Sequence, residues 1–186
     1  MNKIKSLIFT LIVILPVSSC LKEKREATYN SQEDKIDKYI STNMYKKTGD
    51  ITDTLRVEYR GGASRLVITE GNGEKLKADG MVSLYYAGYT FTGNKSSNNL
   101  FITNHKETAE GAKWALTDES FELKLIDMAD TELLKGLKEG LIGVQSGEHC
   151  EILFSGKYGF GKKPFGIIPA NSALLFEIWV EAVSND

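Results

Sequence analysis

The chain has 186 residues, 41% of them hydrophobic, which is enough to bury the core of one domain that also carries extensions. A formal net charge of -2 and the lack of a long block of like charge give no reason to expect a nucleic-acid partner. The chain has 2 histidines, and neither has metal-ligand spacing to a cysteine or carboxylate cluster, so we expect no metal and no cofactor.

The N-terminus has the pattern of a signal peptide. Lys3 and Lys5 supply a positive end, and residues 7–17 form an apolar run shorter than the roughly 20 residues that a membrane-spanning helix needs. The run ends in Val17-Ser18-Ser19-Cys20, which resembles the lipobox of bacterial lipoproteins. This resemblance implies a signal peptide over residues 1–19 and an acylated Cys20; the alternative is an ordinary secretory signal followed by a chance cysteine.

An acylated Cys20 would anchor the protein by its lipid to the cell envelope, with the outer membrane as the expected site and the folded part outside the cytoplasm. Cys150 would then have no partner, so the domain must fold without disulfides, and we expect Cys150 to be a small core residue. The sequence also resembles secreted lipoproteins of Bacteroidetes-type bacteria.

Residues 20–50 are polar and charged, and we expect a tether followed by a short helix. Ile36, Tyr39 and Ile40 recur at helical spacing, which predicts a narrow apolar stripe. Two interpretations stay open: the stripe docks on the folded domain, or the segment is a partly ordered spacer between membrane and domain.

Residues 51–186 predict one α+β domain. Five segments alternate with period 2, which indicates an antiparallel sheet with one buried face. These segments are Leu66–Ile68, Met81–Tyr89, Phe121–Leu125, Cys150–Phe154 and Leu174–Val180. A single helix is predicted around Leu133–Leu141, capped by Asp130 or Thr131 and ended by Gly143. Gly136 and Gly140, four residues apart, would let this helix approach its neighbours closely.

Three stretches, in this order, resemble FK506-binding-protein domains. They are Val82–Gly88, Leu134–Leu141 with the following Gly147-Glu148, and Tyr158-Gly159 with the following Ile168–Ser172 and Leu174–Glu177. The resemblance covers roughly residues 66–183. It implies an antiparallel half-barrel sheet wrapped around one short helix, and a peptidyl-prolyl cis/trans isomerase that assists the folding of envelope or secreted proteins.

Carried over residue by residue, the resemblance implies a pocket between helix and sheet. Its residues would be Tyr86, Phe101, Phe121, Leu133, Leu134, Leu137, Tyr158, Ile168 and Phe176. The Tyr158 hydroxyl and the Ile168 backbone N–H would hold the substrate. Without the resemblance, the same inward-facing side chains would be interpreted as ordinary core. Two departures stand out: Ile102 replaces the family's usual aspartate, and Leu137 replaces the frequent tryptophan. The segments on either side of Phe101 are long and predict a loop or flap at the rim.

The chemistry expected of such a pocket needs no base, nucleophile or metal. An X-Pro bond rotates over a barrier of about 18–20 kcal/mol because resonance flattens the amide. A dry aromatic pocket disfavours the polar planar amide relative to the less polar twisted one. The expected partners are proline-containing polypeptides, the membrane through Cys20, and FK506-like macrolides. The alternatives are a catalytically weak binding module or chaperone on the same fold, or a structural lipoprotein of a surface complex.

One motif argues for a different chemistry and fails. Residues 156–162 have the spacing of a phosphate-binding loop, but Lys163 stands where a serine or threonine must bind magnesium. We therefore expect no nucleotide.

Overall fold

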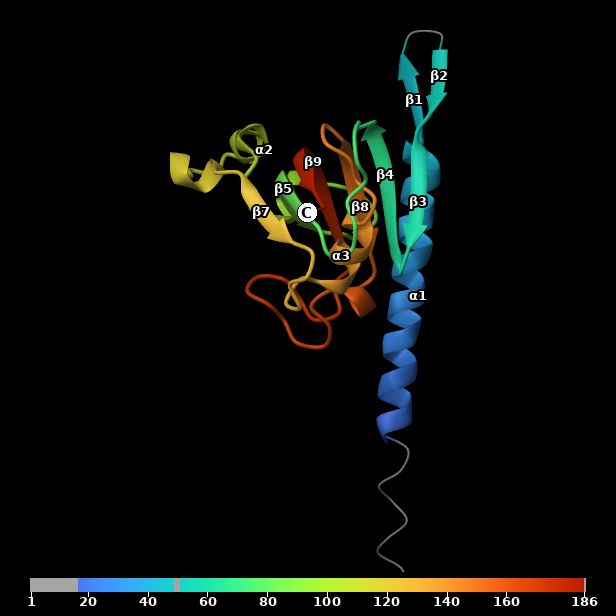
Figure 1. The fold of residues 1–186 in the computed structure, drawn as a ribbon. Helices are drawn as coiled ribbons and strands as arrows, with labels where there is room; N and C mark the ends of the chain where they lie inside the picture. Colours follow the sequence, from blue (N-terminus) through green and yellow to red (C-terminus); the bar gives the residue numbers. More distant parts are fainter. Residues whose placement is uncertain (1–16, 49–50, 186) are drawn as a thin grey trace, which may run out of the picture.

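The structure, a computed structural model, describes residues 17–48 and 51–185, with side chains placed for residues 21–46 and 52–185. The chain begins with a long helix, α1 (Val17–Asn43), which runs along one side of the domain and extends past it at its N-terminal end (Figure 1). A short antiparallel ribbon follows, made of β1 (Tyr45–Thr48) and β2 (Ile51–Thr54). The predicted signal peptide lies largely in residues 1–16, outside the described residues, and the side chain of Cys20 is not described either.

The domain is built on one antiparallel sheet of seven strands, in the order β3-β4-β8-β9-β5-β6 with β7 also paired to β5. The strands are β3 (Arg56–Arg60), β4 (Ala63–Thr69), β5 (Met81–Thr90), β6 (Leu100–Thr103), β7 (Lys124–Asp127), β8 (His149–Phe154) and β9 (Leu174–Ser184). β5 pairs with β9 along its whole length and with β7 and then β6 on its other edge. The predicted antiparallel sheet is therefore confirmed.

Short helices lie in the connections. They are η1 (Ser97–Asn99), α2 (Lys106–Gly111), η2 (Asp118–Phe121), α3 (Lys135–Leu141) and η3 (Gly156–Tyr158). Phe121 closes η2 and does not begin a strand, so β7 starts later than the alternation predicts.

The helix α3 covers the inner face of the sheet, as expected. The predicted caps are wrong: α3 starts at Lys135 with Leu134 at its cap position, because the Asp130 carboxylate instead accepts the Glu132 N–H at 2.8 Å in a turn. Gly143 follows the helix with φ +89°, a left-handed conformation that favours glycine.

A buried arginine fixes the end of α3. Arg65, on β4 and 2% exposed, donates to the carbonyl oxygens of Gly140 and Ile142 at 2.6 and 2.9 Å. Its guanidinium also pairs with Glu58 at 2.6 Å and with buried Glu148 at 3.3 Å. A cation at the carboxyl end of a helix satisfies carbonyl groups that lack partners within the helix, so Arg65 ties α3 to the sheet.

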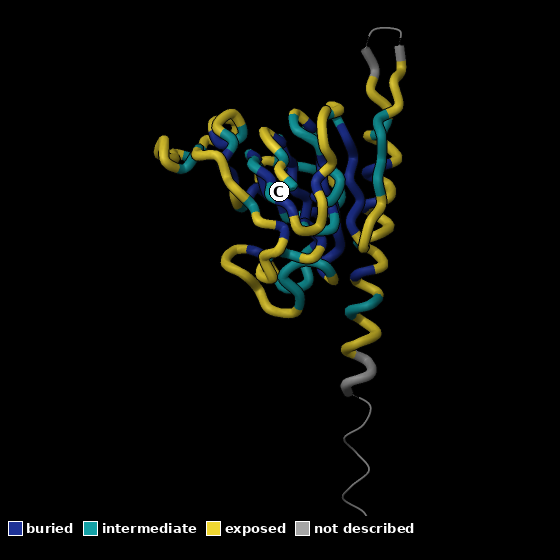
Figure 2. The backbone as a smooth tube through the Cα atoms, in the orientation of Figure 1, coloured by how far each residue is buried: buried dark blue, intermediate teal, exposed yellow. Residues whose placement is uncertain are grey.

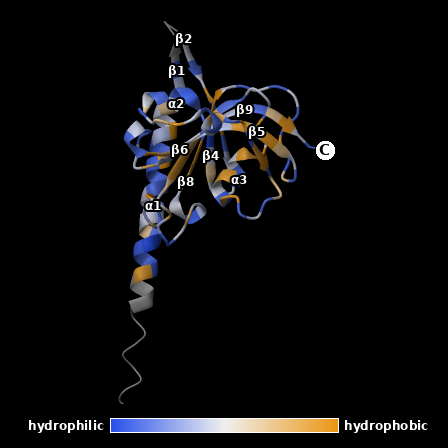
Figure 3. Cartoon of the chain, turned by 90° about the vertical axis from the view of Figure 1, so that its left-hand side faces the viewer, coloured by the Kyte–Doolittle hydropathy of each residue, from blue (hydrophilic) through white to orange (hydrophobic). Residues whose placement is uncertain are grey.

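The two faces of the sheet bury separate apolar clusters. Ile152 and Phe154 of β8 belong to the cluster under α3, whereas Leu153 between them belongs to the cluster on the outer face. Ile36 and Ile40 of α1 are 3% and 2% exposed and belong to this outer cluster. Figure 2 shows the buried sheet next to a helix that is mostly exposed, and Figure 3 shows hydrophobic residues concentrated in the strands. Of the two interpretations left open, the structure therefore shows the apolar stripe docked on the domain.

Candidate functional site

A cavity of about 250 Å³ lies on the inner face, between β5, β6, β9 and the loop that follows η3. It is lined by Tyr86, Phe101, Ile102, Phe160, Phe165, Gly166, Ile167, Ile168 and Phe176. These positions bring together the middle of a long strand, a short edge strand and a loop distant in sequence. Apart from the phenol of Tyr86, their side chains are all apolar.

Aromatic rings form the walls. Phe101 meets Phe176 edge-on, with ring centroids 5.9 Å apart and planes at 87°. Phe160 and Phe165 stack face to face at 4.5 Å on the loop side. Phe154 supports Phe176 from the core at 6.1 Å. Burial raises the pKa of Tyr86, so its hydroxyl stays protonated and neutral at physiological pH. The walls can therefore surround a ligand without presenting a charge to it.

The mouth of the cavity exposes apolar side chains to solvent. Ile102, Phe165 and Ile167 are 40%, 61% and 79% exposed. Exposed apolar groups gathered around a hollow mark a binding surface for an apolar ligand or a polypeptide. The arrangement can hold a proline ring and the side chains next to it, and it can exclude water from the peptide bond that precedes the proline.

The structure brings four of the nine predicted site residues to the cavity: Tyr86, Phe101, Ile168 and Phe176. Four more of the predicted residues contribute to the apolar cluster under α3, on the inner face of the sheet: Leu137 belongs to it, and Leu133, Leu134 and Tyr158 pack against it. The ring of Tyr158 lies 5.5 Å from the Lys135 ammonium and 5.7 Å from the Lys157 ammonium.

Phe121 lies elsewhere. It lines a separate hollow of about 580 Å³ together with Tyr85, Lys106 and Trp179. Tyr85 and Trp179 are opposite each other in register, and adjacent residues of a strand point to opposite faces, so this hollow is on the other side of the sheet from Tyr86. The long connection between β6 and β7 folds into α2 and η2 and carries Phe121 there, instead of forming a rim around the cavity.

One predicted donor is already engaged. The Ile168 N–H donates to the Phe165 carbonyl at 2.9 Å, and the Phe165 N–H donates to the Ile168 carbonyl at 3.0 Å. A substrate that used the Ile168 N–H would have to compete with this turn.

The loop residues Phe160, Phe165 and Ile167 were missed by the sequence reasoning. They lie in a loop that contains several glycines, and no alternating pattern there indicates which side chains point inward. The available signal was composition: large apolar residues in a glycine-rich loop between two matched motifs.

The described side chains offer neither a cluster for a metal nor an accessible thiol. Among residues 17–48 and 51–185, no cluster of three or more histidine, cysteine or acidic residues could hold a metal. Cys150 is fully buried and unpaired, and burial raises the pKa of its thiol. No helix in the described part of the chain is both long and apolar enough to cross a membrane.

Comparison with known proteins gives consistent matches. The sequence profile of the family described as FKBP-type peptidyl-prolyl cis-trans isomerase matches residues 72–181. The chain is 26% identical over 117 residues to FK506-binding protein 1 of Aspergillus oryzae, covering 63% of this chain and 94% of that one. It is 30% identical to the peptidyl-prolyl cis-trans isomerase FKBP12 of Arabidopsis thaliana over 66% of this chain and 98% of that one. A crystal structure of a peptidyl-prolyl cis-trans isomerase from Pseudomonas syringae superposes with a TM-score of 0.57 at 18% identity, covering 86% of this chain and 96% of that one.

Proposed function

This chain belongs to the family of FKBP-type peptidyl-prolyl cis-trans isomerases, and from that premise we propose that the cavity lined by Phe101 and Phe176 binds proline-containing segments of polypeptides and speeds their isomerisation. The observation that carries the proposal is an apolar cavity, aromatic on two sides, whose mouth exposes Ile102, Phe165 and Ile167.

The geometry suits rotation about an X-Pro bond. The planar amide is the more polar state because resonance separates charge between its oxygen and nitrogen, and that separation falls as the bond twists. Apolar rings around the bond solvate the twisted state better than the planar one relative to water, which lowers the barrier. The neutral phenol of Tyr86 is a polar side-chain group in the cavity lining, and in this proposal it would donate to one substrate oxygen.

The test compares two rings that the chain offers as a matched pair. Phe101→Ala removes a ring of the cavity, and Phe121→Ala removes a half-buried ring from the other hollow. NMR exchange on a proline tetrapeptide should show acceleration by the purified full chain and a loss of about ten-fold in kcat/KM for Phe101→Ala, because an aromatic pair contributes about 0.5–1.5 kcal/mol beyond its area. Phe121→Ala should keep the wild-type rate.

A wild-type rate equal to that in buffer would end the proposal, and an equal loss in both variants would show that the cavity is not the site. An FK506-like macrolide is the second probe, and competition with the peptide should disappear in Phe101→Ala.

A binding module with slow turnover is the second candidate, and the engaged N–H of Ile168 favours it, together with Ile102 in place of the family's usual aspartate. Suppression of aggregation of an unfolded client by the wild-type chain, with isomerase activity at the level of buffer, would select this alternative.

We also propose that lipid on Cys20 anchors the protein to the envelope, where its clients would be envelope or secreted proteins. Support comes from the sequence pattern alone: Lys3 and Lys5, the apolar run and Ser18-Ser19-Cys20. Cells fed an alkyne-bearing fatty acid should label the wild-type protein and not Cys20→Ser. An unlabelled wild-type protein would contradict the anchor and leave the isomerase proposal untouched.

A further inference from the structure

Two side chains of α1 bridge the loops that carry residues of the predicted isomerase site. The Gln32 amide donates from Nε2 to the Asn171 carbonyl at 2.7 Å, and its Oε1 accepts the Gly156 N–H at 2.9 Å. One turn earlier in the helix, the Tyr29 hydroxyl donates to Asn171 Oδ1 at 2.8 Å. Tyr29 is 5% exposed and Asn171 is partly exposed, so this bond is partly shielded from water.

The bridged backbone is adjacent to the site. Gly156 begins η3, which ends at Tyr158, and Asn171 follows Ile168 by three residues. The Asn171 N–H donates to the Gly161 carbonyl at 2.7 Å, which ties together the two ends of the loop that forms the cavity wall. The three bonds from α1 therefore meet where this loop begins and ends.

The joint is tight and conformationally unusual. A Cβ placed on Gly156 would lie 2.2 Å from the Asn171 carbonyl oxygen, so the two loops are in direct contact. Asn171 has φ +58°, a left-handed conformation that few residues other than glycine adopt. Such a conformation persists only where the surroundings hold it, and Tyr29 and Gln32 hold both its side chain and its carbonyl.

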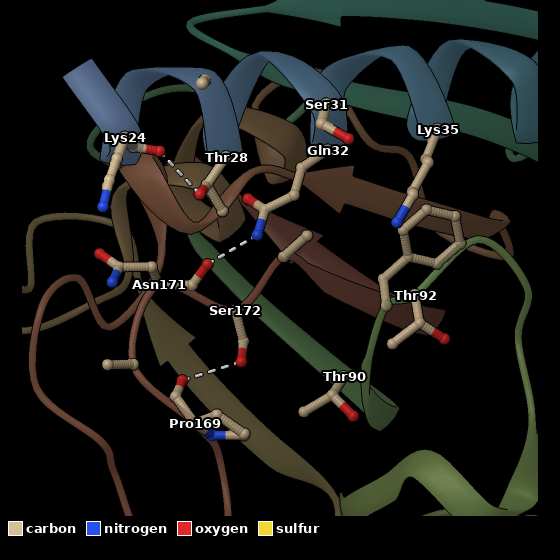
Figure 4. Close-up of a pocket in the computed structure, with 14 residues that line it drawn as sticks. Lys24, Thr28, Ser31, Gln32, Lys35, Thr90, Thr92, Pro169, Asn171 and Ser172 are labelled. Atoms are coloured by element: carbon tan, nitrogen blue, oxygen red, sulfur yellow. Dashed lines mark hydrogen bonds between the residues drawn. The ribbon is translucent and has the colours of Figure 1, made fainter.

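Polar bonds as well as packing hold this end of the helix. A hollow of about 630 Å³ lies between part of α1 and residues 169–173, and Figure 4 shows the Gln32–Asn171 bond at its edge. Ile36, Tyr39 and Ile40, further along α1, are buried in the outer cluster. The register of the loops relative to α1 therefore depends on the polar bridge, whereas the attachment of the helix depends on the apolar residues.

We infer that Tyr29 and Gln32 are positioning residues for the isomerase site, acting through Asn171 and Gly156. The inference rests on the proposed function, because it concerns the loop walls of that cavity. The helix that connects the domain to the N-terminus would then also set the shape of the binding cavity. Loosening the bridge would widen the range of positions available to Ile168 and Tyr158, and misplacement of a wall weakens binding and turnover.

The test uses the purified full chain and two matched Tyr→Phe substitutions on one helix. Tyr29→Phe removes a hydroxyl that bonds the cavity loop, whereas Tyr39→Phe removes a buried hydroxyl that donates to Glu151 on β8 at 2.9 Å. Each variant loses one hydrogen bond, and Tyr39→Phe should lose at least as much stability because its partner is a buried carboxylate. Tyr29→Phe should lower kcat/KM about three- to ten-fold, as expected for a loss of roughly 1 kcal/mol at the site, and Tyr39→Phe should not.

Amide hydrogen exchange provides a readout that does not depend on activity. The N–H groups of Tyr158 and Ile168 are bonded within their turns, at 3.0 and 2.9 Å. In Tyr29→Phe both should exchange faster while the amides of β8 keep their wild-type rates; a purely structural role would raise all of them together. Gln32→Glu keeps the acceptor for Gly156 and loses the donor to Asn171, so Ile168 should exchange faster and Tyr158 should change less.

Equal kinetics and equal exchange in the Tyr29 and Tyr39 variants would overturn the inference. An inactive wild-type chain would instead refute the proposed function and the positioning role with it, while the exchange rates would still show whether α1 orders the two loops.

Discussion

Gly88 brings the backbone of β5 close to the cavity rings. A Cβ at this position would lie 2.8 Å from Phe101 Cζ, 2.9 Å from Ile102 Cγ2 and 3.0 Å from Phe176 Cε1. The absence of a side chain is thus what allows the edge-on pair of Phe101 and Phe176 to rest against the strand. The glycine that ends the motif Val82–Gly88 has a steric role in shaping the cavity.

We predict that Gly88→Ala forces the two rings apart and lowers both stability and activity. Overpacking of this kind costs about 1–3 kcal/mol in unfolding free energy. Gly140→Ala is the matched control, because its Cβ would lie 2.2 Å from Ile152 Cγ2, away from the cavity lining. Urea unfolding should show losses in both variants, whereas kcat/KM measured on folded protein should fall only for Gly88→Ala. Unchanged kinetics in Gly88→Ala would contradict the steric role.

The cavity residues that the sequence could predict are those in regular strands or in quoted motifs. Alternation fixes the sheet face of Tyr86 and Phe176, whereas Phe101 and Ile168 were expected in the cavity only from the family resemblance. Phe121 lies at the end of a long connection that folds into α2 and η2. Because Phe121 is in a short helix and not in a strand, alternation does not predict the side of the sheet on which its ring lies. Phe160 and Phe165 owe their places to tertiary packing of a loop, which no local pattern encodes.

At the scale of elements, α3 shows why glycines recur on one side of a short helix. A Cβ on Gly136 would lie 2.2 Å from Cγ of Phe154, and Gly140 is equally close to Ile152. The helix therefore sits directly on β8, closer than any residue with a side chain would permit. The sequence predicted close approach from this spacing, and the structure shows that side chains of β8 are what the glycines accommodate.

We predict opposite signs for the same substitution in two helices. Alanine is favoured over glycine by about 1 kcal/mol in a helix interior, but Gly136→Ala must displace the Phe154 ring and should lower unfolding free energy by about 1–3 kcal/mol. Gly111→Ala at the end of α2 meets no heavy atom within 4 Å in the described part of the chain, so it should be neutral or slightly stabilising. The two variants are compared with the wild type by thermal unfolding monitored by circular dichroism. A stabilised Gly136→Ala variant would contradict the packing argument.

Elements with alternating hydrophobicity were predictable, and the others were not. Alternate residues of β5, β8 and β9 face the inner cluster, among them Leu84, Ile152 and Phe176, so a period of two is visible in the sequence. The sequences of β1, β2 and most of α1 consist mainly of polar residues, which gives no apolar period to detect. The helix is consequently much longer than the short segment that Ile36, Tyr39 and Ile40 predict.

At the scale of the whole molecule, the sheet separates a cavity on its inner face from a docked helix on its outer face. The outer cluster includes Ile36 and Ile40 from α1 and Leu66, Leu153 and Leu175 from the sheet. A buried hydrogen bond adds to this contact, because the Tyr39 hydroxyl of α1 donates to the Glu151 carboxylate of β8. Buried contacts therefore cross residue 50, so helix and sheet have a common core although the family profile begins at residue 72.

A shared core predicts that α1 and the sheet unfold together. Ile40, 2% exposed, loses its contacts in Ile40→Ala, which should lower the unfolding free energy by about 2–5 kcal/mol. Far-ultraviolet circular dichroism reports mainly on the helices, and tryptophan fluorescence reports on the sheet domain, because Trp179 on β9 and Trp114 both pack against the outer cluster. In urea the two signals should shift together to a lower midpoint, as one cooperative transition.

The neighbouring exposed residue is the control for this shift. Ser41→Ala removes an exposed hydroxyl that bonds the Lys38 carbonyl of the same helix, so its midpoint should stay within experimental error of the wild type. Separate midpoints for the two signals, or an Ile40→Ala variant that loses helix before fluorescence changes, would show α1 to be an independent attachment. Coincident midpoints would show that α1 and the sheet unfold as one cooperative unit, to which the cavity loop is also joined by the bonds of Tyr29 and Gln32 to Asn171.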